Sequence, residues 1–246
     1  VGVSVYMVRT FSAAGQFTSL PVYGTQACFK LEEIPGAEDI TIDRKAGVIY
    51  ISSLNRRATQ AERGEIYRLD LKLERAAMAV TPMTEGLPEA FAPLGMSLFE
   101  RANGKHRLFV INRAAGKTPS VEIFDLQGDQ LKHVKTITSP GITTPNNLVA
   151  VGDEQFYLTN DGLQEVGAIQ AFFDFANQKK KGNVIYFDGK SAKPAASGFV
   201  MANGIAKNSD GKVLYVSDSY ARTLKFFARD DKNALTEIGD LFVGTG

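Results

Sequence analysis

The sequence has few of the residues that zinc sites and many catalytic sites depend on. Its 246 residues include no tryptophan, one cysteine and two histidines. A single cysteine, Cys28, cannot form a disulfide within the chain, and no Cys/His set is present that could hold zinc. The histidines, His106 and His133, lie in a turn-like run and in an expected strand, so we expect both at the surface rather than in catalysis.

Charge and long apolar runs are also scarce. The net charge is +1, which gives no bulk electrostatic reason to expect a nucleic-acid partner. Residues 1–11 are apolar but shorter than the roughly 20 residues that cross a bilayer. They are interpreted either as a first strand or as the trailing end of a signal or membrane anchor. The second alternative predicts an exported or membrane-anchored protein, periplasmic or extracellular, with residues 1–25 as a separate N-terminal segment.

The rest of the chain, residues 26–246, is a succession of short strands and turns. Hydrophobic residues make up 44% and charged residues 22%, as in an ordinary globular domain, and 23 glycines suit many tight turns. Alternating apolar patterns predict strands at 40–42, 48–53, 64–70, 96–99, 108–112, 120–126, 148–151, 155–161, 182–188, 204–206, 213–218 and 223–227. These fall into four units with a period of roughly 50 residues, the period of propeller blades. The fold class predicted is all-β, a β-propeller.

Each unit opens with a similar short motif. The openings are GAED at 36–39, PLGM at 93–96, PNNL at 145–148 and ANGI at 202–205. Because blade openings converge on the propeller axis, Glu38, Asn146 and Asn203 should meet there. Neighbouring side chains of a regular strand point to opposite faces, so Glu38 and Asp39 are expected to serve two positions, one above the other.

Carboxylate and amide oxygens are ligands that Ca²⁺ prefers. The openings therefore predict a calcium site at Glu38, Asn146 and Asn203. Asp39 and Asn147, with the backbone carbonyl of Met96, could hold a second, deeper ion. The alternative is an acidic strand opening in solvent beside asparagines that merely form turns.

Residues 164–181 break the strand pattern. Their apolar residues have near-helical spacing, and the segment ends in the basic run 179–181. We expect a lid or short helix packed on the propeller. The alternative is an interfacial helix that touches a membrane or covers a site.

Several motifs together resemble the paraoxonase/arylesterase family, calcium-dependent six-bladed propellers that hydrolyse lactones and aryl esters and are related to gluconolactonase-like propellers. The motifs are GAED at 36–39, ISS at 51–53, SVEIF at 120–124, NLVAVG at 147–152, FYLTND at 156–161 and ANGI at 202–205. The resemblance implies a catalytic calcium at Glu38, Asn146 and Asn203 and a structural calcium at Asp39 and Asn147. The family usually has Asp at position 147, so the amide here should weaken the second ion.

The chain departs from the family at its histidines. Leu94, Arg113 and Gly162 stand where family members typically have histidine. The family's histidine dyad therefore cannot form, and a general base would have to be another group, such as Asp161.

The length is a second departure, because only four of the expected six blades can be counted. The resemblance also implies an Asp-Asn pair and a C-terminal cysteine matching Cys28, and neither is present. The hypothesis is that the chain is a fragment or one piece of a longer protein, with a C-terminal piece that pairs with Cys28. A complete four-bladed propeller is the alternative.

Two functions follow from these residues. The first is a calcium-dependent lactonase or arylesterase acting on a small lactone or ester. The second is a catalytically degenerate, calcium-stabilised propeller that serves as a binding or accessory subunit, with membrane contact through residues 1–11 or 164–181. Leu94 and Arg113 favour the second, and retention of Glu38 with the asparagines favours the first.

Overall fold

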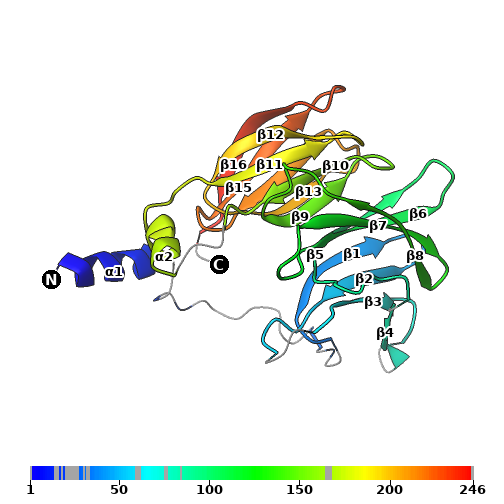
Figure 1. Cartoon of the computed structure of the whole chain (residues 1–246). Coiled ribbons are helices and arrows are strands. Elements are labelled where there is room, and N and C mark those ends of the chain that lie inside the picture. Colours follow the sequence, from blue (N-terminus) through cyan, green and yellow to red (C-terminus); the bar gives the residue numbers. More distant parts are fainter. Residues whose placement is uncertain are drawn as a thin grey trace.

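The chain forms four antiparallel sheets that follow one another along the sequence. A computed structural model describes residues 2–13, 17, 19, 28–29, 31, 34–58, 62–74, 77–83, 85–163 and 168–244. Each sheet has four strands, paired in the order in which the chain makes them. The sheets lie side by side as blades (Figure 1), and the predicted all-β propeller is confirmed, with four blades in the described residues.

Each blade runs from a strand near the axis to one at the rim. The blades comprise β1 Ala37–Asp43, β2 Val48–Ser53, β3 Glu65–Asp70 and β4 Val80–Pro82; β5 Pro93–Glu100, β6 His106–Asn112, β7 Ser120–Gln127 and β8 Gln130–Ile137; β9 Pro145–Ala150, β10 Phe156–Asn160, β11 Gly182–Phe187 and β12 Ala192–Phe199; and β13 Ala202–Lys207, β14 Val213–Asp218, β15 Thr223–Arg229 and β16 Leu235–Phe242. The first strand of each blade contacts the first strand of the next, in the series β1, β5, β9 and β13. These four strands are therefore the inner strands.

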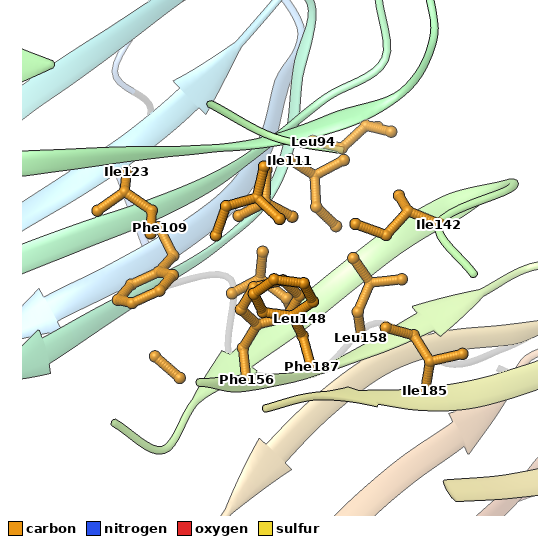
Figure 2. Close-up of a cluster of buried hydrophobic side chains, with 13 residues drawn as sticks. Leu94, Phe109, Ile111, Ile123, Ile142, Leu148, Phe156, Leu158, Ile185 and Phe187 are labelled. Atoms are coloured by element: carbon orange, nitrogen blue, oxygen red, sulfur yellow. The ribbon is translucent and has the colours of Figure 1, made fainter. Parts of the chain in front are cut away.

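Strand alternation builds a separate hydrophobic layer between each pair of blades. In β6, Leu108 and Val110 face the cluster shared with the first blade. Phe109 and Ile111 face the cluster shared with the third blade, shown in Figure 2. All four side chains are fully buried, because successive side chains point to opposite faces and both faces are covered. This explains why the central strands read as continuous apolar runs.

The fourth strand of each blade is the part that the apolar pattern does not indicate. The inner three strands of every unit match their predicted positions within a few residues. β16, in contrast, is exposed along almost its whole length and is held by its backbone pairing with β15. His133 lies in such a rim strand, β8, as expected of a strand residue.

Two helices lie outside the blades. The prediction of a first strand in residues 1–11 is wrong, because α1 spans Gly2–Ala13. The helix expected within 164–181 is confirmed as α2, Ala168–Ala176, while residues 164–167 lie outside the described part. Tyr6 of α1 faces Phe173 of α2, with ring centroids 6.5 Å apart. Figure 1 shows α2 toward the later blades and α1 beyond it, projecting away from the sheets. Among the described residues, neither helix has the length and apolarity needed to span a bilayer.

Candidate functional site at the blade openings

Every inner strand carries one extra residue at its opening. Against β2, β1 fits Glu38 between Ala37 and Asp39 without a partner. Against β10, β9 does the same with Asn146. β5 has Leu94 and Gly95 opposite one residue of β6, and β13 has residues 203–204 opposite one residue of β14. A bulge re-aims the side chain at the extra position, so the predicted site residues occupy the positions where the backbone departs from a regular strand.

The Asp39 carboxylate joins the first two openings. Its Oδ2 accepts a hydrogen bond of 2.7 Å from the backbone N–H of Met96, and its Oδ1 accepts one of 2.8 Å from Ile40. Burial raises the pKa of Asp39 above its ordinary value, although hydrogen bonds from Met96, Ile40 and the Asn147 amide oppose the rise; the charge of Glu38 adds to it. Asp39 is therefore a partly buried carboxylate whose hydrogen bonds to Met96 and Asn147 connect β1 to β5 and β9.

A glycine brings the second and third openings into contact. A Cβ atom on Gly95 would lie 2.4 Å from Cα of Asn147, so the backbones approach as closely as only glycine permits. On the other side of β9, the Thr159 hydroxyl lies 2.6 Å from the carbonyl of Asn203 and 3.2 Å from that of Asn147. Contacts therefore run through all four openings, and the structure brings the predicted residues Asp39, Met96, Asn147 and Asn203 together.

The oxygen donors predicted to bind calcium differ in how far other groups already engage them. Glu38 is exposed, while Asn146 and Asn203 are half-buried. In the described part of the chain, none of these three side chains is hydrogen-bonded to another group, although the Glu38 carboxylate lies within ion-pair distance of Arg56. Their oxygens are therefore the candidate ligands for a cation. The deeper pair is already engaged, because Asn147 hydrogen-bonds to Asp39 and its Oδ1 accepts the N–H of Leu148 at 2.6 Å. The described residues also contain no cluster of three His, Cys, Asp or Glu side chains, so any such site depends on amide oxygens.

Asp161, the predicted general base, lies just beyond β10 with both oxygens engaged. Its Oδ2 accepts a hydrogen bond from Nη1 of Arg113 at 2.8 Å. Its Oδ1 accepts the N–H of Leu163 at 2.7 Å. The Asp161 side chain is 3% exposed, so the ion pair is largely shielded from water. Both oxygens are thus hydrogen-bonded within the protein, and the role of Asp161 as a base stays a prediction.

The backbone explains one of the missing histidines. Gly162 has a φ of +77°, and a Cβ there would come within 2.6 Å of the backbone of Lys181. A histidine would be strained by both the φ angle and the contact. Glycine is thus required by the way residues 161–163 turn toward α2.

Arg56 also belongs to the candidate site, although the sequence did not indicate it. Its Nε lies 3.8 Å from Oε2 of Glu38, and its Nη2 donates to the carbonyl of Pro93 at 2.8 Å. It therefore places a positive charge beside the exposed carboxylate and ties the loop after β2 to the start of β5. The only local signal was a pair of arginines after the strand 48–53, which does not distinguish this contact from a solvated surface.

A pocket of about 620 Å³ adjoins the openings. Its walls come from the loop after β2, the segment before β5 and the loop after β6; the lining residues are Leu54, Asn55, Arg56, Ala58, Glu62, Arg63, Glu89, Ala90, Phe91, Ala92, Arg113, Ala114 and Ala115. Arg56 and Arg113 belong both to this lining and to the contacts of Glu38 and Asp161. The volume is that of a small-molecule site.

Sequence comparisons place these residues among known proteins. Residues 32–246 match the family described as Arylesterase. The chain is 30% identical over 227 residues to human serum paraoxonase/lactonase 3, which covers 89% of this chain and 63% of that protein. It is 33% identical over 201 residues to chicken serum paraoxonase/arylesterase 2, covering 78% of this chain and 56% of that protein. The chain thus spans less than two thirds of the length of these relatives.

Solved structures share the architecture. The gluconolactonase of Xanthomonas campestris superposes with a TM-score of 0.51 at 12% identity, over 76% of this chain and 55% of that one. The periplasmic gluconolactonase of Pseudomonas aeruginosa gives a TM-score of 0.51 at 12% identity, over 82% of this chain and 56% of that one. At such identities the likeness concerns the propeller fold alone.

Proposed function

This chain belongs to the arylesterase family, and on that premise we propose that it is a calcium-dependent hydrolase of lactones or aryl esters. The observation that carries the proposal is the bulge in every inner strand, which places Glu38, Asn146 and Asn203 at openings whose inner strands contact one another in series. Retention of three oxygen-bearing side chains at these positions supports a site at the axis. The adjoining pocket offers room for a small ester or lactone.

In this proposal Glu38, Asn146 and Asn203 hold the ion. Calcium bound there would polarise the substrate carbonyl and stabilise the negative charge that develops on its oxygen. Arg56 would limit repulsion between Glu38 and an anionic product, because its guanidinium already lies beside that carboxylate. Leu94, buried behind the second opening, contributes packing rather than proton transfer.

The chain's own histidines lie in other partnerships. His106 contacts Asp43, and His133 contacts Glu122. Asp161 is the carboxylate at the site's edge that could take a proton, and its two oxygens already accept hydrogen bonds from Arg113 and Leu163. We therefore expect hydrolysis, where it occurs, to be slower than that of a propeller with a positioned histidine base.

A second function is favoured by the same Arg113–Asp161 pair. With that carboxylate engaged, the propeller could bind calcium for stability and act as a binding or accessory subunit. The apolar side chains exposed on the two helices, Val5, Met7, Val8, Phe11, Ile169 and Phe173, suit the contact with a membrane surface that we propose for such a subunit. Co-sedimentation with liposomes tests the contact, and a protein that stays in the supernatant contradicts it.

One experiment separates the two functions. Turnover of a panel of lactones and aryl esters is measured with calcium and with chelator, in the wild type and in Glu38→Gln. Glu154→Gln is the control, because Glu154 is a partly exposed glutamate paired with Lys135, away from the openings. Turnover that needs calcium and disappears in Glu38→Gln alone supports the hydrolase. Calcium-dependent melting without turnover supports the accessory subunit, and the absence of any calcium effect overturns both.

A further inference from the structure

The second strand of every blade ends in a buried polar residue. This residue lies in register with the first residue of the inner strand, immediately before the bulge. We call these four the strand-end residues; they are Ser53, Asn112, Asn160 and Asp218. Each is at most 8% exposed, and polar groups buried so deeply are as a rule hydrogen-bonded. Their partners therefore indicate what they do.

The backbone makes the same contact beside each strand-end residue. The residue that follows it donates its N–H to the carbonyl of the residue that precedes the inner strand. These bonds run from Leu54 to Gly36 at 3.2 Å, Arg113 to Ala92 at 3.0 Å, Asp161 to Thr144 at 2.8 Å and Ser219 to Met201 at 3.0 Å. In every blade the segment entering the opening is thus bound to the end of the second strand, two positions before the bulged residue.

The Asn160 side chain adds a second set of bonds in the third blade. Its Oδ1 accepts the N–H groups of Thr143 at 3.0 Å and Thr144 at 3.1 Å. Its Nδ2 donates at 2.9 Å both to the carbonyl of Gly141 and to Oδ1 of Asn183. Every donor and acceptor site of this amide is therefore engaged. The segment that it holds leads directly into the third opening.

Asp218 has the equivalent position in the fourth blade. Its Oδ2 accepts the N–H of Val200 and its Oδ1 that of Met201, both at 2.9 Å. Oδ1 also lies 3.4 Å from the N–H of Ala221. The carboxylate therefore binds the segment that enters the fourth opening, where Asn203 follows two positions after Met201.

We propose that Asn160 and Asp218 are positioning residues that hold Asn146 and Asn203 where their amide oxygens reach one cation. The two ligands lie in bulges and have no cross-strand partners, so their positions depend on how the chain enters the opening. A ligand held in place beforehand loses less conformational freedom when the ion binds. The inference rests on the proposed function, because that supplies the cation.

The second opening supplies a matched control. Asn112 binds the entering segment in the same way, through the N–H of Ala92 at 2.9 Å and the carbonyl of Ala90 at 3.0 Å. Its Nδ2 also donates to the buried carboxylate of Glu122 at 3.3 Å. The bulge that follows carries no side-chain oxygen. Removing the Asn112 amide should therefore destabilise the fold, as removing that of Asn160 does, without displacing a cation ligand.

Calcium affinity is measured by titration calorimetry on the wild type, Asn160→Ala and Asn112→Ala, and stability by melting in chelator. Residues that orient the ligands of a metal typically contribute about 10–100-fold to its affinity, so we expect Asn160→Ala to bind calcium at least about tenfold more weakly. Asn112→Ala should lose stability and keep the affinity of the wild type. Equal affinities in all three proteins, or equal losses in both variants, overturn the positioning role alone. Absence of binding to the wild type overturns the proposed function with it.

Amide hydrogen exchange of the wild type decides the question if Asn160→Ala does not fold. Coupling between ion binding and the strand-end contacts is reciprocal, so calcium should in turn stabilise the bonds that the positioning residues make. Exchange of the Thr144 and Met201 amides, measured by NMR, should slow on addition of calcium more than that of the Ala92 amide, which bonds to Asn112. An equal change at the three amides overturns the inference.

Discussion

Asp39 and Glu122 are both shielded carboxylates, and the protein surrounds them differently. Glu122 receives four partners and has a lowered pKa, whereas Asp39, at the blade openings, has a raised pKa because its hydrogen bonds do not offset burial. Because hydrogen bonds to four side chains compensate its charge, Glu122 is part of the structural framework. The hydrogen bonds of Asp39 do not fully compensate its negative charge, and an uncompensated charge at the openings attracts a cation. The comparison separates a carboxylate that is fully hydrogen-bonded within the fold from one whose charge is incompletely compensated at the blade openings.

The largest effect should come from removing the satisfied carboxylate. Glu122→Leu leaves the buried donors of Ser120 and Asn112 without their acceptor and removes the partner of the exposed Thr136 hydroxyl, so we expect a loss of about 3–5 kcal/mol in the free energy of unfolding. Urea denaturation measures it. Glu154→Gln, at a surface ion pair, should change the same quantity by less than about 1 kcal/mol. A small loss in Glu122→Leu would mean that the network contributes little to stability.

A backbone change at the openings should have the next largest effect. Gly95→Ala places a Cβ 2.4 Å from Cα of Asn147, and forcing β5 and β9 apart should cost about 1–3 kcal/mol. Gly204→Ala is a matched control at the fourth opening, where the nearest atom is the Ser217 hydroxyl at 3.3 Å. Equal losses in the two variants, measured by thermal melting, would show that contact between the second and third openings is not what holds them.

Asn147→Asp adds a second carboxylate to the openings and should strengthen their attraction for a cation. A second carboxylate beside Asp39 replaces a donor with a like charge, so in chelator we expect a loss of about 1–2 kcal/mol. Added calcium should then restore stability by more than it does in the wild type. Calcium titrations of both proteins, followed by melting temperature, compare the two responses. An equal response would contradict the view that the Asn147 amide weakens a second ion.

The smallest effect expected is a difference in acid sensitivity. Because the pKa of Glu122 is lowered in the folded state, its stabilisation is present above the unfolded carboxyl pKa and is lost as the pH falls through the folded value. Glu122→Gln should therefore unfold with a shallower dependence on pH below about pH 4, near the ordinary glutamate pKa. Unfolding at a series of acidic pH values tests this, and parallel curves for the two proteins would contradict it.

The fold was largely readable from the sequence because its signals are local. Alternation in the inner strands and the openings at Glu38, Asn146 and Asn203 recur with a fixed period, and the structure keeps them in register. The rim strands were not readable, since exposed residues such as those of β16 carry no apolar pattern and pair through their backbones. The strand predicted in residues 1–11 was wrong because a uniformly apolar segment has no period that distinguishes a strand from a helix.

The site was readable only in part, because several of its contacts join distant segments. Asp39 to Met96, Arg113 to Asp161 and Arg56 to Glu38 each link different blades or loops. No local pattern indicates such pairs. The bulges were likewise hidden, since an extra residue is visible only against the partner strand, yet they alone explain how consecutive residues at an opening can both serve it.

Because a bulge recurs at the opening of each inner strand, the side chains near the axis can differ between propellers while the backbone stays the same. In each inner strand the extra residue has no cross-strand partner, so its side chain can be replaced while the ladder on either side stays intact. The four inner strands thus carry four structurally equivalent positions, one at each opening. Glu38, Asn146 and Asn203 occupy three of these positions, and a new ligand preference there would need only new side chains. At the second opening Leu94 is fixed by core packing and Gly95 by its contact with Asn147.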